Sequence, residues 1–160
     1  MKKIIISMVA LIAILTSCKK DVVTSPYYVG ESYGGGIIFY IDSTNNHGLI
    51  AAPIDQNDSC PAFANVSIFN NKWDTTHYAY YYCNKYNGGN YSDWVLPSKE
   101  QLILMYVNKE KIGGFKNINY WACTVFVKEF SSYAINFSNG NINTLSDFNS
   151  YCGVRAIRNF

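Results

Sequence analysis

The chain has 160 residues, of which 49% are hydrophobic and 16% aromatic, and its formal net charge is +2. This composition supports a hydrophobic core and argues against intrinsic disorder. A net charge near zero, without a cluster of arginines, argues against nucleic-acid binding and against attachment to a membrane through a polybasic surface.

The first residues are typical of a secretory signal. Lys2 and Lys3 precede an apolar run over residues 4–15, which is shorter than the ~20 residues that a membrane-spanning helix needs. The segment Leu15-Thr16-Ser17-Cys18 resembles the lipobox, which bacterial lipoprotein signal peptidase cleaves before a lipidated cysteine. We therefore expect residues 1–17 to be removed and Cys18 to be acylated, which anchors the protein to the lipid bilayer. The alternative is an ordinary secretory signal in which Cys18 stands by chance.

The residue after Cys18 bears on the final location. In bacteria with two membranes, Asp at this position is typical of lipoproteins retained in the inner membrane, and this chain has Lys19 there. The resemblance implies the outer membrane. Lys20 followed by Asp21 loosely resembles a signal for surface export, so we expect the cell surface, with the periplasmic face as the alternative. Loss of Lys2 and Lys3 would leave eleven basic and eleven acidic side chains.

Residues 18–29 are interpreted as the lipidated cysteine and a tether, and residues 30–160 as one domain. Within it, β-branched and aromatic residues predict strands over residues 37–41 and 49–52. The glycines at 34–36 precede the first strand instead of following it, and no Gly-Lys-Ser/Thr sequence follows. We therefore expect these glycines to give the backbone conformational freedom before the strand, and not to form a phosphate-binding loop.

Two helices are predicted next. The first covers about 75–86, with Asp74 or Thr75 as N-cap and Gly88 beyond its end. Its tyrosines are interpreted as packing residues, with a carbohydrate platform as the alternative. The second helix starts at Ser98, which forms a capping box with the glutamine three residues on, and it ends at Gly113-Gly114.

The remainder of the chain reads as β-structure. Strands are predicted over 121–126, 133–137, 141–145 and 154–157, and Ser138-Asn139-Gly140 is a hairpin signal between two of them. Two strands, two helices and then several antiparallel strands indicate the α+β class.

Four parts of this sequence resemble a known family. They are residues 36–41 with 47–52, the block 91–102 that contains Asp93-Trp94-Val95-Leu96-Pro97-Ser98-Lys99-Glu100, the pair Tyr120-Trp121, and the end Gly153-Val154-Arg155-Ala156-Ile157-Arg158. They are similar to the Fibrobacter major paralogous domain and its relative, the C-terminal domain of the Legionella collagen-like adhesin. The resemblance implies a C-type-lectin-like fold in a secreted or surface protein, and some members bind sugars or host polymers. The chain departs from the family at Cys123 and Cys152.

Motifs for catalysis or metal binding are not found in the sequence. The Glu-Pro-Asn, Gln-Pro-Asp and Trp-Asn-Asp motifs of calcium-dependent lectins are missing, so no metal ion or cofactor is predicted. His47 lies in a predicted turn, where a surface position is expected, and His77 has no carboxylate or cysteine at metal-ligand spacing. Asp93 and Glu100 are candidates for an acid/base pair, but a carboxylate at Glu100 is favourable in a first helical turn for structural reasons, and we interpret both residues as structural. We therefore expect no enzymatic activity.

Four cysteines remain beside Cys18. An even number in an exported protein predicts two disulfides, with three possible connectivities. The preferred pairs are Cys60–Cys83 and Cys123–Cys152, where the second would join two strands that the fold of the family places in one sheet. The runner-up is Cys83–Cys152 with Cys60–Cys123, because lectin-type domains often link the first helix to the last strand.

We hypothesise that the C-terminal quarter forms a ligand-binding surface, because it is rich in Tyr and Asn, whose side chains suit recognition. Domains of this family include targets of retroelements that randomise adenines, and codons for Asn, Tyr and Ser contain them. The alternative is an ordinary polar sheet face with Asn-rich turns. The ligand-binding residues predicted on this basis are Ser131, Tyr133, Asn139, Asn141, Asn143, Asp147, Asn149 and Tyr151.

Three functions are compatible with these observations. The leading hypothesis is a lipid-anchored binding module, an adhesin or receptor-like domain whose partner is an unknown protein or glycan. The second is an enzyme that acts on envelope or dietary glycan, and two facing carboxylates in a pocket would favour it. The third is a structural envelope lipoprotein without a soluble ligand.

Overall fold

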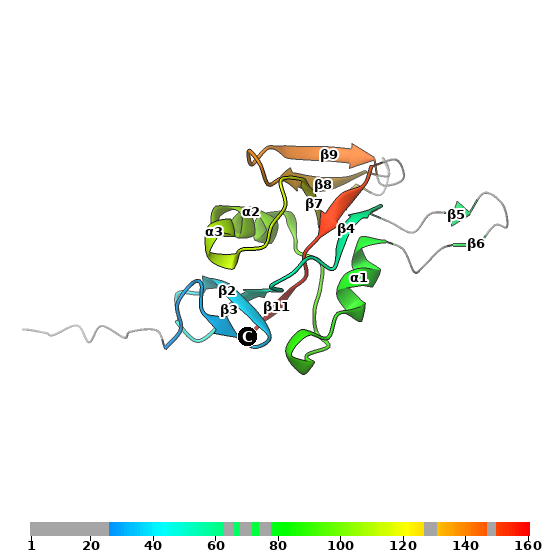
Figure 1. The fold of residues 1–160 in the computed structure, drawn as a ribbon. Helices are drawn as coiled ribbons and strands as arrows, with labels where there is room; N and C mark the ends of the chain where they lie inside the picture. The colour runs from blue at the N-terminus through cyan, green and yellow to red at the C-terminus, as the bar shows by residue number, and fades with distance from the viewer. Residues whose placement is uncertain (1–25, 63–65, 68–71, 74–77, 127–130, 147–149) are drawn as a thin grey trace, which may run out of the picture.

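In a computed structural model of the chain, the described residues are 26–62, 66–67, 72–73, 78–126, 131–146 and 150–160 (Figure 1). They form short helices and two main sheets in which antiparallel pairing predominates, so the fold is of the α+β class, as predicted. The predicted signal, Cys18 and the tether up to residue 25 lie outside these residues. No helix in the described ranges is long and apolar enough to cross a membrane.

One antiparallel sheet brings the start of the domain next to its end. Its order is β1 (Ser32–Tyr33), β2 (Gly36–Ile41), β3 (Gly48–Ala51) and β11 (Ile157–Asn159). The predictions for β2 and β3 are confirmed. Gly34 and Gly35, with φ of 54° and 84°, form the turn between β1 and β2. These positive φ values support the prediction that the glycines provide conformational freedom to the backbone. Figure 1 shows the C-terminus beside β2 and β3.

The second sheet has five strands. Its order is β4 (Asn57–Cys60), β10 (Cys152–Val154), β7 (Asn119–Phe126), β8 (Ser131–Asn136) and β9 (Ile142–Ser146). Gly153 of β10 pairs with Tyr120 of β7 in parallel, and the other neighbouring strands pair antiparallel. The predicted hairpin between β8 and β9 is confirmed, with Gly140 at φ of 80°. A separate two-stranded sheet pairs β5 (Val66–Ser67) with β6 (Lys72–Trp73).

The prediction of one continuous strand over 154–157 is wrong, because the chain passes from one sheet to the other there. Val154 ends β10 and Ile157 begins β11. Between them, the Ala156 carbonyl accepts from the Ala52 amide, and the Ala156 amide donates to the Gln56 side chain. These bonds replace strand pairing and carry the chain from one sheet to the other.

The first helix is shorter than predicted. Helix α1 (Ala79–Lys85) has Tyr78 as N-cap, without a side-chain capping bond, and Tyr86 as C-cap. Asp74 and Thr75 lie outside the described residues. Gly88 does not cap α1, because it begins a 3-10 helix, η1 (Gly88–Asn90).

The second predicted helix is divided in two. Ser98 and Gln101 form the predicted capping box at the start of α2 (Lys99–Val107). At Asn108, with φ of −103° and ψ of 15°, the helix breaks, and α3 (Lys109–Ile112) follows. The Asn108 side-chain amide donates to the carbonyls of Leu104 and Phe39, which ties the break to β2. Gly113, with φ of 75°, ends α3 and not α2.

Alternate residues of the five-stranded sheet join two different core clusters. Trp121, Ala134 and Cys152 belong to the cluster that contains Ala79 and Cys83 of α1. Tyr120, Ile135 and Phe137 belong to the cluster that contains Leu102 and Met105 of α2. The two faces of this sheet therefore pack against different helices.

The folded part begins before residue 30. The Tyr27 ring lies 5.0 Å from the rings of both Tyr33 and Phe160, measured between centroids. The Gly30 amide donates to the Ile38 carbonyl at 2.8 Å. The tether predicted over 18–29 is therefore too long at its C-terminal end, because Tyr27 already packs against both ends of the domain.

Candidate functional site

Arg158 organises the surface near the C-terminus. Its guanidinium donates to both carboxylate oxygens of Asp93, at 2.8 and 3.1 Å, and to the Gly34 carbonyl at 3.3 Å. The hydrogen bond from Arg158 lowers the pKa of Asp93 below its usual value. The bidentate pair fixes the direction of the guanidinium and holds the β1–β2 turn in place.

One exposed tyrosine covers the guanidinium of this ion pair, and a second precedes the turn that Arg158 holds. The Tyr91 ring covers the Arg158 guanidinium at 3.7 Å, a cation–π contact. Tyr91 is 40% exposed, and Tyr33, which precedes Gly34, is 41% exposed. Both rings are therefore accessible to a ligand while their surroundings are fixed by a buried arginine.

Glycines bring two backbone segments together between these tyrosines. A Cβ atom on Gly35 would lie 2.6 Å from the Gly88 carbonyl oxygen, and one on Gly89 would lie 2.4 Å from the Gly35 Cα. Any larger residue would separate the segments. We call Tyr33, Gly34, Gly35, Gly88, Gly89 and Tyr91 the tyrosine–glycine surface.

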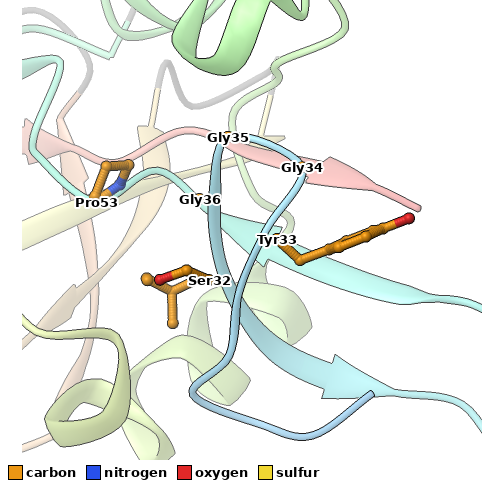
Figure 2. Close-up of a pocket in the computed structure, with 7 residues that line it drawn as sticks. Ser32, Tyr33, Gly34, Gly35, Gly36 and Pro53 are labelled. Atoms are coloured by element: carbon orange, nitrogen blue, oxygen red, sulfur yellow. The ribbon is translucent and has the colours of Figure 1, made fainter. Parts of the chain in front are cut away.

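An open pocket of about 320 Å³ adjoins this surface (Figure 2). It is lined by Ser32, Tyr33, the glycines 34–36, Ile37 and Pro53. Figure 2 shows that Ser32 and Tyr33 project to opposite sides of the turn, and the Tyr33 ring points away from Pro53. None of the lining residues is charged at neutral pH. The pocket offers apolar contacts, hydroxyls and backbone groups, which suit binding better than proton transfer.

A second, smaller pocket of about 120 Å³ lies at the end of α3. Its lining includes Lys109, Glu110 and Lys116. The Lys109 ammonium donates to the Phe137 carbonyl at 2.7 Å and lies over the Tyr106 ring. Neither of these two pockets contains a pair of facing carboxylates.

The two carboxylates considered as an acid/base pair have separate structural partners. Asp93 binds Arg158. Glu100 accepts a hydrogen bond from the Ser98 hydroxyl at 3.1 Å, in the first turn of α2. Their hydrogen bonds agree with the structural interpretation of both residues.

The arginines of the terminal motif also have different partners. Arg155 is fully buried, and its Nε lies 2.6 Å from an oxygen of Asp55. Its remaining donors reach the carbonyls of Ala52, Gly113 and Gly114. Asp55 also accepts from the Tyr120 hydroxyl at 2.7 Å. Arg155 therefore stabilises the core, whereas Arg158 shapes the surface.

The residues predicted as a ligand surface are not gathered on one face. Asn139 and Asn141 are exposed at the β8–β9 hairpin, and Tyr151 is exposed just before β10.

Two other predicted positions contact neighbouring side chains. Tyr133 lies under the Lys99 ammonium at the start of α2. Asn143, in register with Ala134, faces the other side of the sheet and donates to the Asn119 side chain. Asp147 and Asn149 lie outside the described residues.

Ser131 is not a surface residue. It is buried, in register with Phe126 of β7 and Ser146 of β9. Its hydroxyl and that of Ser132 are buried without a hydrogen-bond partner. Ser131 begins β8, the strand between β7 and β9, and composition does not reveal this position.

The four cysteines of the domain are thiols in the structure. The two predicted sets of pairs stay predictions. Cys60, Cys83 and Cys152 are buried in one core cluster, and Cys123 is exposed. The described part of the chain contains no group of three His, Cys, Asp or Glu side chains that could hold a metal ion.

No protein-family model and no curated protein matches this chain. The family resemblance therefore rests on the sequence motifs. Sequence reasoning missed the tyrosine–glycine surface, although Tyr91 stands inside the quoted block. The position of Tyr33 directly before three glycines was the sequence feature that could have indicated its role.

Proposed function

We propose that the protein is a lipid-anchored, non-enzymatic binding module of the outer membrane, with a C-type-lectin-like fold. Acylated Cys18 holds it in the bilayer, and the domain faces the cell surface, or the periplasm if surface export fails. The observation that carries the binding function is the tyrosine–glycine surface, in which two exposed rings flank backbone segments fixed by Arg158. The ligand is a glycan or a protein segment.

The chemistry of this surface supports binding. Tyr gives a large contact area with few rotatable bonds, so little entropy is lost when a ligand covers it. Arg158 reduces that loss further, because it already holds Tyr91 and the turn after Tyr33. The adjoining pocket adds apolar contacts.

The test is a binding screen of the full-length protein in detergent against glycan arrays and host-polymer extracts. Tyr33→Ala and Tyr91→Ala should each weaken a detected interaction at least tenfold, that is by about 1.4 kcal/mol. Tyr40→Ala is the matched control, because Tyr40 is 39% exposed but lies further along β2. Loss of binding in Tyr40→Ala to the same degree, or no ligand in any panel, would contradict the proposal.

The diversified-surface hypothesis stays a prediction that concerns other residues. Asn139, Asn141 and Tyr151 are the predicted positions whose exposure suits contact with a ligand. The deciding observation is genomic. A near-copy of the 3′ end of the gene, differing at adenines and lying beside a reverse transcriptase, would support active diversification, and a genome without such a copy excludes it.

A further inference from the structure

Two cysteines lie directly opposite each other on neighbouring strands. Cys60 of β4 and Cys152 of β10 are register partners in the antiparallel pair. Residues in such positions have Cα atoms about 4.5–5.5 Å apart, which falls within the range that disulfides span. Both are almost fully buried, at 3% and 2% exposure, and both belong to the same core cluster.

The other two cysteines are placed differently. Cys83 is on α1, and Cys123 is on β7 with an exposed side chain. The Cys123 amide donates to the Pro97 carbonyl, which directs this part of β7 towards the start of α2. Neither Cys83 nor Cys123 is a register partner of Cys60 or Cys152.

We propose that Cys60 and Cys152 form a cross-strand disulfide in the exported protein. This pairing differs from both sets predicted from the sequence, and its formation in the cell rests on the proposed export. The bond joins the strand that precedes residues 61–78 to the strand that leads into the terminal motif.

The bond forms by thiol–disulfide exchange with a disulfide-bearing oxidant, such as a dithiol oxidase or oxidised glutathione. One cysteine, as thiolate, attacks a sulfur of the oxidant, which releases one thiolate and leaves a mixed disulfide. The second cysteine, as thiolate, attacks the protein sulfur of that mixed disulfide and releases the other thiolate. The two cysteines lose two electrons and two protons in total, and the oxidant is reduced to two thiols.

The surroundings of both thiols determine when this exchange can take place. Burial raises the pKa of Cys60 and of Cys152 to about 12, so little thiolate exists in the folded protein at neutral pH. Because both thiols are also almost fully buried in the folded protein, we expect the bond to form before β4 and β10 pair. Once folded in the reduced state, the protein should react first at exposed Cys123.

Peptide mapping tests the pairing because trypsin separates the four cysteines. Cleavage after lysine and arginine places Cys60 in 21–72, Cys83 in 73–85, Cys123 in 117–128 and Cys152 in 129–155. Full-length protein from membranes is alkylated and digested without reductant. The expected product is peptide 21–72 linked to 129–155. Linkage of 21–72 to 73–85, or of 117–128 to 129–155, would overturn the proposal.

A second arm separates the pairing from export. The reduced, denatured full-length chain is refolded in a glutathione redox buffer and mapped in the same way. A 21–72 to 129–155 link in this sample supports the pairing even if the cellular protein lacks it, in which case the export proposal fails. Alkylation of both cysteines as free thiols after oxidative refolding would overturn the pairing.

Matched variants complete the test. Cys60→Ser should leave Cys152 open to alkylation in the denatured, non-reduced sample. Cys83→Ser removes an equally buried cysteine from the same core cluster and should leave the 21–72 to 129–155 link intact. Loss of that link in Cys83→Ser, with Cys60 and Cys152 recovered as alkylated thiols, would contradict the assignment.

Discussion

Arg155 and Arg158 stand three residues apart, and their surroundings give them different roles. Arg155 lies on the Phe115 ring at 4.1 Å and has protein acceptors for its donors, including the buried Asp55 carboxylate. Arg158 pairs with Asp93, whose side chain is more than half exposed. A buried charge that loses its partner is much more costly than an exposed one.

Arg155→Met should therefore lower the free energy of unfolding by about 3–5 kcal/mol, because Asp55 would remain buried without its cation. Urea denaturation of the purified protein measures this change. Lys116→Met is the control, since Lys116 forms an exposed ion pair with Asp58, and it should cost less than about 1 kcal/mol. Equal losses in the two variants would contradict the structural role of Arg155.

Trp94 is fully buried. Its indole N–H donates to the Gly88 carbonyl at 3.1 Å, and the Tyr86 ring packs edge-on against it at 5.0 Å. Trp94→Ala should lower the free energy of unfolding by about 3–5 kcal/mol. Val95→Ala, at an exposed neighbouring position, should lower it much less. A Trp94→Ala protein that melts with the parent would show that this assignment to the core is wrong.

At the scale of elements, the start of α2 was predictable and the start of α1 was not. The Ser98 hydroxyl accepts from the Gln101 amide at 3.2 Å, and the Gln101 side chain accepts from the Ser98 amide at 2.8 Å. Such a box is local in sequence, so the residue types reveal it. Helix α1 starts at Tyr78 without a side-chain cap, and its position depends on packing against β4 and β10 instead.

Ser98→Ala removes the cap and should lower the free energy of unfolding by about 1 kcal/mol. Ser92→Ala, at an exposed position before α2, serves as control and should change it by less than about 0.5 kcal/mol. Thermal denaturation of both variants beside the parent distinguishes these outcomes. A Ser98→Ala change no larger than that of the control would argue against a stabilising capping box.

Hydrophobic patterns predicted the long strands, and long-range contacts determined the rest. Alternation in β8 and the apolar run in β2 are visible in the sequence. The break between β10 and β11, at Arg155 and Ala156, is different. It depends on hydrogen bonds to Asp55, Ala52 and Gln56, about 100 residues away, so no local pattern reveals it. The tyrosine–glycine surface was missed for the same reason, because Arg158 assembles it from distant segments.

For the whole molecule, the buried thiols and Tyr120 should make the folded state less stable at alkaline pH. The pKa values of Cys60 and Cys152 rise from 9.0 to about 12 on burial, and burial also raises the pKa of Tyr120. Because the folded pKa exceeds the unfolded one, this contribution is complete below pH 9 and is lost as the pH rises towards 12.

We expect the free energy of unfolding of the reduced protein to fall from about pH 9 upward. In the oxidised protein, Cys60 and Cys152 no longer titrate, so the fall should be shallower, while buried Cys83 and Tyr120 still contribute. Urea titrations at a series of pH values, with and without reductant, measure both curves. Curves of identical slope would contradict a disulfide between these two residues.

Acylation at Cys18 is the claim on which both the proposed location and the cellular disulfide depend. Mass spectrometry of the N-terminal peptide from membrane-purified protein tests it most directly. We predict a peptide that begins at Cys18 and carries a diacylglycerol and an N-acyl chain, and none of either in Cys18→Ala. A mature protein that retains residues 1–17, or that begins at an unmodified Cys18, would contradict the account.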